Sequence, residues 1–290
     1  MQTYQNSSAA EIFLFLKEIT YYEDGISKII EEAVLFKPKT KKELQLAIQE
    51  TTGPDSEKNS KINNYKYGPI DLWNTSLITD MSNLFMSCKT FNEPINNWEV
   101  SQVTNMASMF SDCYNFNQPL DKWVVSSVTN LEGMFYDCEV FNQQLDKWNI
   151  SRVTNIDWMF SGCVMFNQPL DCWDVGQVTT MENVFARCLK FNQPLNYWDV
   201  SLVENMASMF FDCKSFNQPI DFWDVRSVTN MTSMFSRCKE FDQTLDNWDI
   251  SSVSDMEAMF YACTAHAREQ PSRWGIRSGE RGLGGHHYVH

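Results

Sequence analysis

The side chains best suited to acid–base catalysis are confined to one end of this chain. Its four histidines are His266, His286, His287 and His290. Residues 1–265 therefore contain no histidine, which excludes histidine-based acid–base chemistry, activation of a serine or cysteine nucleophile by histidine, and most zinc sites from the body of the protein. The spacing His286-His287-x-x-His290 could bind a transition metal, but a flexible histidine tail does so incidentally. We expect no catalytic residue, no metal site and no cofactor.

The cysteines are the second set of reactive side chains, and all but Cys172 recur at a constant interval of 25 residues. They are Cys88, Cys113, Cys138, Cys163, Cys188, Cys213, Cys238 and Cys263. Each lies in an apolar pattern, where a free cysteine acts as a small buried hydrophobe, and packed helices lie too far apart for disulfides between neighbouring units. We expect structural thiols in the core. Cys172 directly precedes a tryptophan at an outward position, so we expect it to be the reactive thiol.

Tryptophan has the same period and so indicates the elements that position these residues. Eight tryptophans lie 25 residues apart, at Trp73, Trp98, Trp123, Trp148, Trp173, Trp198, Trp223 and Trp248. A period between about 20 and 50 residues, kept without insertion, is the signature of a solenoid whose units bury their apolar faces against their neighbours. The sequence therefore predicts an α/β repeat solenoid of eight coils in which the tryptophans and cysteines form ladders in the core.

Each unit divides into a predicted strand and a predicted helix. Ile95, Trp98 and Val100 have the residue types and alternation of a short strand. The second half has apolar residues at i, i+3, i+4 and i+7, which is one face of a helix. They are Met106, Met109, Phe110 and Cys113. With Thr104 as N-cap, we expect strand-helix coils whose strands form a parallel sheet along one side of a curved rod.

One asparagine in most units predicts a further ladder. These residues are Asn92, Asn117, Asn142, Asn167, Asn192 and Asn217. Stacked side-chain amides bond from coil to coil while they satisfy backbone groups of the turns. We therefore expect a structural role for this row.

The repeat W-D-V-S-x-V-T-N-M-x-x-M-F-x-x-C-x-x-F-N-Q-P-L, almost unaltered from Trp198 to Ile220, resembles a known bacterial surface-protein repeat related to BspA-like leucine-rich repeats. The resemblance covers about residues 66–264. Such repeats occur on surface proteins and lipoproteins of mycoplasmas, lactobacilli and listeriae, and in giant viruses of amoebae. The resemblance implies a leucine-rich-repeat-like solenoid that binds or adheres. Val103 stands where leucine-rich repeats carry their ladder asparagine, so their curvature is not carried over.

The sequence outside the repeats predicts a cap, a linker and a tail. Residues 1–50 are expected to form three helices that cover the first coil, with capping boxes at Ser8-x-x-Glu11 and Thr40-x-x-Glu43. Residues 51–65 are polar and read as a linker, and 66–264 form the solenoid. Residues 265–290 are rich in Gly, Arg and His. We expect this tail to be mostly disordered, as the remnant of a frameshift; the alternative is a second cap.

The net charge and the absence of targeting signals bear on the class of partner and on the location of the protein. The formal net charge is −14, which argues against nucleic acid. The N-terminus lacks the basic region of a signal peptide, and no segment is long and apolar enough to span a membrane. We therefore expect a cytoplasmic or virion-associated protein.

The residues on either side of each tryptophan form the candidate binding surface, because they point outward if Trp and Val point inward. The candidate partner-binding residues are Glu99, Asp174, Tyr197, Asp199, Phe222, Asp224 and Asp249. Tyr197 and Phe222, two outward aromatics among acids, form the expected hot spot. The alternative is that all of them are ordinary solvated residues.

These observations predict a non-enzymatic protein-interaction or structural scaffold module, with a virion or capsid component as one setting. Its partner is expected to be a protein, such as another capsid or surface protein, and copies could associate end to end. One alternative is a surface adhesin that binds a host protein or a glycan. Another makes the N-terminal helices an adaptor domain.

Overall fold

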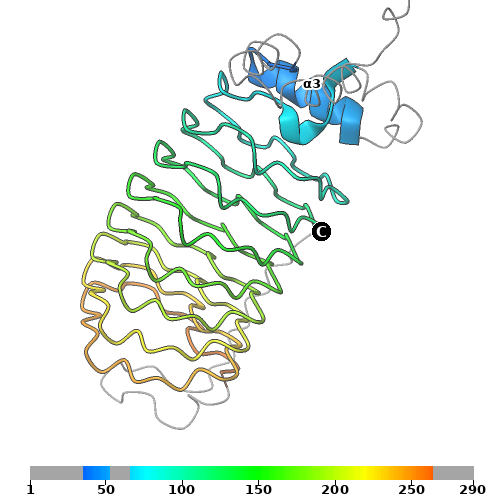
Figure 1. Ribbon diagram of the computed structural model, residues 1–290. Coiled ribbons are helices and arrows are strands. Elements are labelled where there is room, and N and C mark those ends of the chain that lie inside the picture. Colours follow the sequence, from blue (N-terminus) through cyan, green and yellow to red (C-terminus); the bar gives the residue numbers. More distant parts are fainter. Residues whose placement is uncertain (1–34, 53–65, 264–290) are drawn as a thin grey trace, which may run out of the picture.

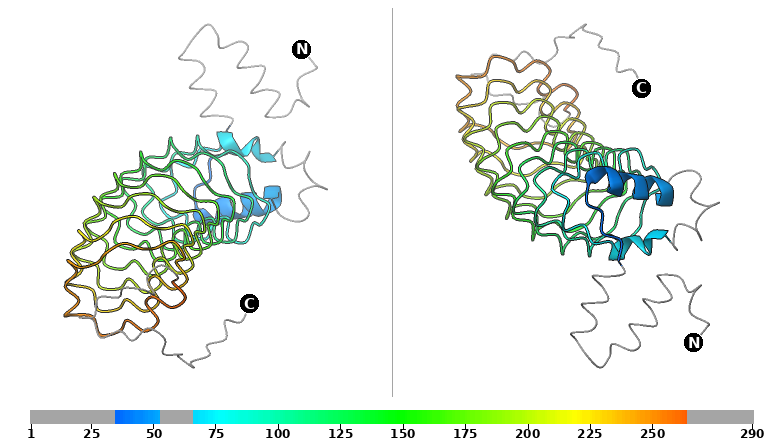
Figure 2. Two further views of the ribbon diagram at one scale, coloured as in Figure 1. Left: turned by 90° about the horizontal axis from the view of Figure 1, so that it is seen from below. Right: turned by 90° about the horizontal axis from the view of Figure 1, so that it is seen from above.

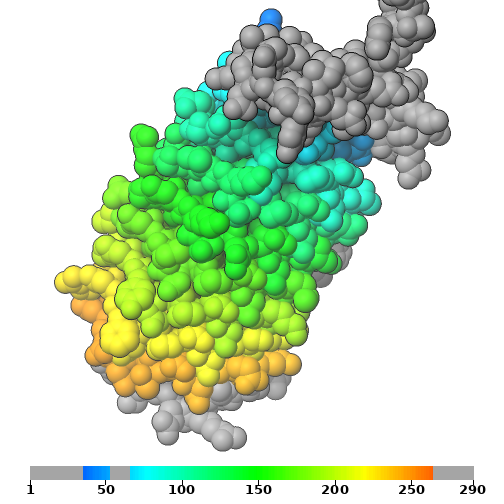
Figure 3. Space-filling view, in the orientation of Figure 1, coloured from blue at the N-terminus to red at the C-terminus, as the bar shows by residue number. Residues whose placement is uncertain are grey.

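The main body of the protein is a stack of coils, in which residues 25 positions apart in the sequence lie one above another (Figure 1). The structure is a computed structural model that describes residues 35–52 and 66–263. The coils follow one another as closely packed bands on the surface (Figure 3). Two predicted N-terminal helices, most of the predicted linker and all of the predicted tail lie outside the described residues.

Helix α3, Lys41–Thr52, is the α-helix that precedes the coils. The Thr40 hydroxyl accepts the N–H of Glu43 at 3.2 Å, and the Glu43 carboxylate accepts the N–H of Lys39 at 2.6 Å. These bonds satisfy backbone donors that the helix itself leaves without partners. The predicted third helix and Thr40 as its N-cap are confirmed, but Glu43 accepts the N–H of Lys39 instead of that of Thr40, and the helix ends two residues beyond the predicted boundary at residue 50.

Helix α3 lies over the first coil (Figure 1). Its buried residues belong to the same core cluster as the coils, and they are Leu44, Ala47 and Ile48. The Lys41 ammonium donates to Asp80 at 3.1 Å and to the Ser82 hydroxyl at 2.6 Å. The 3-10 helix η2, Ile70–Leu72, then leads into the first ladder tryptophan. Helix α3 thus shields apolar side chains at the N-terminal end of the stack from water.

The segment predicted as a helix in each coil is instead a run of turns. Ser108 has φ 54° and Asp112 has φ 60°, values that a right-handed helix does not contain. Alternate amides, those of Met106, Ser108, Phe110 and Asp112, donate to carbonyls of the next coil at 2.7–3.0 Å. The amides between them, those of Met109, Ser111 and Cys113, donate to carbonyls three residues earlier at 3.0–3.2 Å. The helix prediction is therefore wrong.

The apolar spacing was misleading because consecutive turns bring the same positions to one side. Met106, Met109, Phe110 and Cys113 are all fully buried, as a helical face would be. Thr104, the predicted N-cap, donates its N–H and its hydroxyl to the carbonyl of Thr79 in the preceding coil, at 2.8 and 3.2 Å. The backbone donors of this segment therefore hold neighbouring coils together rather than closing helical turns.

The predicted sheet is also absent from the described residues. Consecutive coils meet there in isolated parallel bridges, which run from Asp80↔Asn105 to Asn230↔Asp255. Around the tryptophans the amides bond locally, because Trp98 donates to Ile95 at 3.1 Å and Val103 donates to Val100 at 2.9 Å. The regular repeat with its ladders is confirmed, and the strand-helix interior of each coil is corrected to turns.

Side chains in the core fasten each coil to the one before it. The Trp123 indole donates to the Ile95 carbonyl at 3.1 Å, and the equivalent bond recurs from Trp98 to Trp248. The Cys113 thiol donates to the Phe85 carbonyl at 3.0 Å, a bond repeated through Cys238. The Asn117 N–H donates to the Asn92 side chain at 2.9 Å, and this pattern continues along the row. The predicted asparagine ladder is confirmed.

The stack bends, as Figure 2 shows. The spacing between equivalent rings in adjacent coils grows across the core. It is 5.7 Å for Phe110 and Phe135, 5.9 Å for Phe116 and Phe141, and 6.4 Å for Trp123 and Trp148. Strands paired by hydrogen bonds lie about 4.8 Å apart, so the coils are closest at the bridges. The tryptophan side is therefore the convex side.

Candidate functional site

The convex side carries two outward rows, the residues immediately before and immediately after each ladder tryptophan, which we call the flanking face. The tryptophans are buried, with 3% of Trp198 and 4% of Trp223 exposed. Their preceding neighbours are the opposite, since Tyr197 is 82% and Phe222 76% exposed. Exposed and buried positions thus alternate along this segment. Large aromatic side chains are seldom left so open to water on a soluble protein.

The structure places most of the predicted site residues together. Asp174, Asp199, Asp224 and Asp249 occupy consecutive coils in the row after the tryptophans, and Tyr197 and Phe222 occupy consecutive coils in the row before them. We call these six residues the acidic-aromatic strip. Glu99 is exposed in the same row, but the coils of Val124 and Asn149 separate it from Asp174. Glu99 is therefore not part of the strip.

The residue after each tryptophan has a structural task. One carboxylate oxygen accepts the backbone N–H two residues later, at 3.1 Å for Asp174, 3.0 Å for Asp199 and 3.1 Å for Asp249. Asn74 and Asn149 accept the equivalent N–H through their amide oxygens, each at 3.1 Å. The same turn forms with Asn149, which is neutral, and with Val124, which has no side-chain acceptor, so it does not require a charge. The four consecutive aspartates therefore add a negative charge that the fold does not require.

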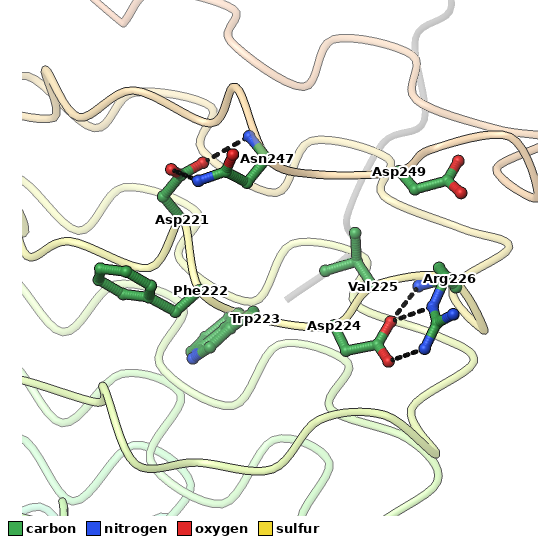
Figure 4. A pocket seen from close by; sticks show the side chains of 8 residues that line it. All are labelled: Asp221, Phe222, Trp223, Asp224, Val225, Arg226, Asn247 and Asp249. Atoms are coloured by element: carbon green, nitrogen blue, oxygen red, sulfur yellow. Dashed lines mark hydrogen bonds and ion pairs between the residues drawn. The ribbon is translucent and has the colours of Figure 1, made fainter.

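A hollow of about 330 Å³ lies at the C-terminal end of the strip (Figure 4). Its lining residues are Asp221, Phe222, Trp223, Asp224, Val225, Arg226, Asn247 and Asp249. In this view Phe222 lies to the left of Trp223 and Asp224 and Arg226 lie to its right, whereas Asp221, Asn247 and Asp249 lie above them. The Asn247 amide side chain and its backbone N–H both donate to the Asp221 carboxylate. The lining is thus aromatic, amide and acidic, with three carboxylates and one guanidinium.

Arg226 forms a two-pronged ion pair with Asp224. Its Nε donates to Oδ1 at 2.8 Å and its Nη2 donates to Oδ2 at 2.6 Å. These bonds lower the pKa of Asp224 to about 2. A hydrogen bond from Ser251 lowers the pKa of Asp249. Both carboxylates are therefore ionised at neutral pH.

The comparison with known proteins rests on the repeat. A family model described as "Mycoplasma protein of unknown function, DUF285" matches residues 56–173 and 156–274, which together make up more than half of the chain. The chain belongs to the DUF285 family. No curated protein and no solved structure matches it. Membership of DUF285 accounts for the repeated coils and assigns no activity to them.

Sequence reasoning missed three polar residues of this DUF285 site, namely Asp221, Arg226 and Asn247. The sequence could have pointed to Arg226, because the other coils have small residues at the equivalent position. They are Ser76, Ser101, Ser126, Ser151, Gly176, Ser201 and Ser251. The positions of Asp221 and Asn247 are polar in many coils. Nothing in the sequence therefore distinguishes these two residues, which form hydrogen bonds between adjacent coils.

The cysteines of the DUF285 coils are all free thiols. Burial raises the pKa of Cys138, Cys163 and Cys188 well above the ordinary value, so these thiols stay protonated and donate to carbonyls. Cys172 is exposed, but partial desolvation and the charge of Asp171 raise its pKa, and its thiol donates to the Asp146 carbonyl at 3.2 Å. Since the thiolate is the reactive form, the expectation of an activated Cys172 is not supported.

Two further sequence-based expectations bear on the described residues. Among residues 35–52 and 66–263, no three His, Cys, Asp or Glu side chains are grouped so that they could hold a metal ion. The helices of this part of the chain are too short or too polar to cross a membrane. The motif His286-His287-x-x-His290 lies outside the described residues.

Proposed function

We propose that this DUF285 chain is a non-enzymatic protein-interaction or scaffold module that binds a protein partner through the acidic-aromatic strip. The observation that carries the proposal is the exposure of Tyr197 and Phe222 on adjacent coils. Four of the other coils have polar residues at this position, namely Asn97, Lys122, Lys147 and Asn247, and the remaining two have Leu72 and Cys172. Exposed aromatic side chains that lie together are typical of binding hot spots, because they bury a large area on contact.

The distribution of acids supports an interaction module over an enzyme. The strip carboxylates are copies of one position in successive coils, and each accepts the same backbone N–H. A catalytic site needs groups with distinct environments and distinct pKa values. The body of the chain also contains no histidine to act as a general base near neutral pH.

The setting of the module is a further proposal. The resemblance to BspA-like, leucine-rich-repeat-related surface repeats supports a place on the surface of a cell or a virion, where a scaffold binds other surface or capsid proteins. The convex position of the strip suits this role, because a partner can reach it without entering the curve of the stack.

Substitution of the two aromatics tests the proposal. The variant Tyr197→Asn/Phe222→Asn carries the residue that the chain itself has at Asn97 and Asn247, so the fold should tolerate it. Lys122→Asn/Lys147→Asn is the matched control in the same row. Affinity capture from cells of the source organism, with quantitative mass spectrometry, should yield a protein retained by the wild type and the control and lost with the aromatic variant. Equal capture of every protein by all three forms would overturn the proposal.

A glycan-binding adhesin is the second candidate, because the hollow places the Phe222 ring beside Asp221 and Asn247. An aromatic ring can stack on a sugar while carboxylate and amide groups bond its hydroxyls. A glycan array separates the candidates. Hits that disappear with Phe222→Asn would favour the adhesin, whereas no hits together with a variant-sensitive protein partner would favour the interaction module.

A further inference from the structure

We propose that the acidic-aromatic strip docks an extended basic segment of the partner, whose arginine or lysine side chains alternate with smaller residues and pair with aspartates of consecutive coils. This inference rests on the proposed function and names the chemistry of the partner. The segment runs along the stack. Its cationic groups lie over Asp174, Asp199 and Asp249, and Tyr197 and Phe222 cover its flank.

Charge complementarity is the first support. Four consecutive coils each present an aspartate in one row, although the same turn forms with the neutral residues Val124 and Asn149. Within residues 35–52 and 66–263, Asp224 is the one member of the strip in an ion pair. Arg226 also attracts the Asp249 carboxylate without forming an ion pair with it, whereas Asp174 and Asp199 form no ion pair with a lysine or arginine of this part of the chain. A cationic partner would neutralise the aspartates of the strip, and the electrostatic attraction would increase its rate of association.

The Asp224–Arg226 pair is the second support, because it is an intramolecular example of the proposed contact. Asp224 Oδ1 accepts the Arg226 backbone N–H at 3.3 Å and its Nε at 2.8 Å, while Oδ2 accepts Nη2 at 2.6 Å. One carboxylate of this row can therefore hold its turn and bind a guanidinium by two prongs at once. Such pairs are among the stronger charge-assisted hydrogen bonds.

The spacing of the coils is the third support, and it determines which residues of the bound segment face which coil. The rings of Trp223 and Trp248 are 6.5 Å apart, and those of Trp123 and Trp148 are 6.4 Å apart. An extended chain rises about 3.3–3.4 Å per residue, so alternate side chains on one face lie roughly 6.7 Å apart. An extended segment along the convex side therefore meets one coil with every second residue.

The aromatic row is the fourth support. Elsewhere in the coils, cations lie over rings, with Arg237 5.6 Å from the centre of Phe211 and Lys89 5.5 Å from that of Tyr114. Tyr197 and Phe222 are far more exposed than those rings, and Phe222 lies across Trp223 from Asp224 (Figure 4). Aliphatic stems and guanidinium planes of a basic segment can pack on these rings while their charges reach the aspartates.

Three eight-residue peptides test the inference on the full-length protein by fluorescence anisotropy at about 150 mM salt, where long-range attraction is largely screened. One alternates Arg and Ser, the second has the same composition in two blocks, and the third alternates Glu and Ser. The alternating arginine peptide should bind about tenfold more tightly than the block peptide, and the glutamate peptide should not bind. Asp199→Asn and Asp249→Asn should each weaken the alternating peptide about tenfold, while Glu99→Gln, the matched control outside the strip, leaves binding unchanged.

The contrary outcomes separate this inference from the proposed function. Equal affinity for the alternating and block peptides, or no difference between the aspartate variants and Glu99→Gln, would overturn the basic-segment inference. Absence of binding to both arginine peptides would overturn it as well. The capture experiment with the aromatic variant would still stand in those cases, because it makes no assumption about the charge of the partner.

Discussion

The N-terminal and C-terminal halves of the flanking face have the same backbone and different chemistry. In the N-terminal half, Lys122 and Lys147 precede their tryptophans, and Lys147 pairs with Asp121 at 3.5 Å. In the C-terminal half, the same row holds Tyr197 and Phe222. The row after the tryptophans changes likewise, from Val124 and Asn149 to Asp199 and Asp224.

This comparison separates positions that build the coil from positions that are free to vary. Trp123 and Trp223 stand in opposite halves, yet both are buried and each donates its indole N–H to a carbonyl at 3.1 Å. The residues beside them share no such bond and differ in charge and size. The repeat therefore keeps a constant core under a surface that can acquire a binding site locally.

Removal of a ladder tryptophan should have the largest effect, and the same effect in both halves. Trp123→Ala and Trp223→Ala should each lower the free energy of unfolding by about 3–5 kcal/mol, because each leaves a large cavity and a buried carbonyl without its donor. Urea unfolding measures this. The control Phe222→Asn should change the free energy of unfolding by less than about 0.5 kcal/mol. A much smaller cost for Trp223→Ala than for Trp123→Ala would mean that the halves differ in their core as well.

The row two residues after each bridge residue offers a second comparison, between coils with and without an acid, and Asp157 in this row is half-buried. Glu132, Asp157 and Glu182 occupy one row in consecutive coils, whereas the coils before and after them have Ala107 and Ala207 there. Burial raises the pKa of Asp157 to about 6, although hydrogen bonds from Thr180 and the Glu182 N–H oppose the rise. A carboxyl with a raised pKa in the folded state binds its proton more tightly there than in the unfolded chain. Its contribution to stability is therefore complete at low pH and is lost as pH rises from about 4 through 6.

Asp157→Asn should consequently stabilise the protein at pH 8 by about 1 kcal/mol after allowance for partial solvent screening. The gain should shrink to near zero below about pH 3, where the aspartate is protonated in both states. Thermal unfolding of the two proteins between about pH 3 and pH 8 measures the difference. A variant that is less stable than the wild type at pH 8 would show that the hydrogen bonds of Asp157 outweigh its burial.

Several features could be predicted from the sequence because they depend on one residue type repeated at one interval. The tryptophan, cysteine and asparagine ladders follow from the period alone, and the capping box at Thr40 predicted helix α3 from local chemistry. The turns around Ser108 could not be predicted, since the amides there bond to the next coil and the apolar spacing matches a helix. The outward rows of the candidate site were predictable by alternation. The Asp221–Asn247 contact was not, because it depends on the register between coils.

Transfer of the strip to the N-terminal half would sharpen the first comparison. The substitutions Lys122→Phe, Val124→Asp, Lys147→Tyr and Asn149→Asp place the C-terminal chemistry on the N-terminal coils. An aspartate at position 124 can accept the turn N–H as it does in other coils, so the free energy of unfolding should change by less than about 1 kcal/mol. A twelve-residue alternating arginine peptide, which spans six coils, should bind this variant about tenfold more tightly than the wild type by calorimetry. Equal affinity for the two proteins would show that the strip needs more than its side chains.

Arg226→Ser should have the smallest effect on stability, because it restores the residue found at Ser201 and Ser251 and removes an exposed ion pair. The melting temperature at pH 7 should be unchanged within error. The pair lowers the pKa of Asp224, so its contribution is present above about pH 4 and is lost as pH falls through about 2. Affinity for the alternating arginine peptide should rise two- to threefold, because Asp224 becomes available to it. A fall in affinity would mean that Arg226 itself contacts the partner.

The tryptophan ladder provides the most direct test of where the partner binds, since each coil contains one indole N–H directly beneath the flanking face. Two-dimensional 1H–15N spectra of the full chain, with indole signals assigned by single Trp→Phe variants, can follow a titration with the alternating arginine peptide. We predict that the signals of Trp198 and Trp223 shift while those of Trp98 and Trp123 stay in place. Equal shifts along the whole ladder, or the largest shifts at Trp123 and Trp148, would contradict the claim that the site lies on the C-terminal half.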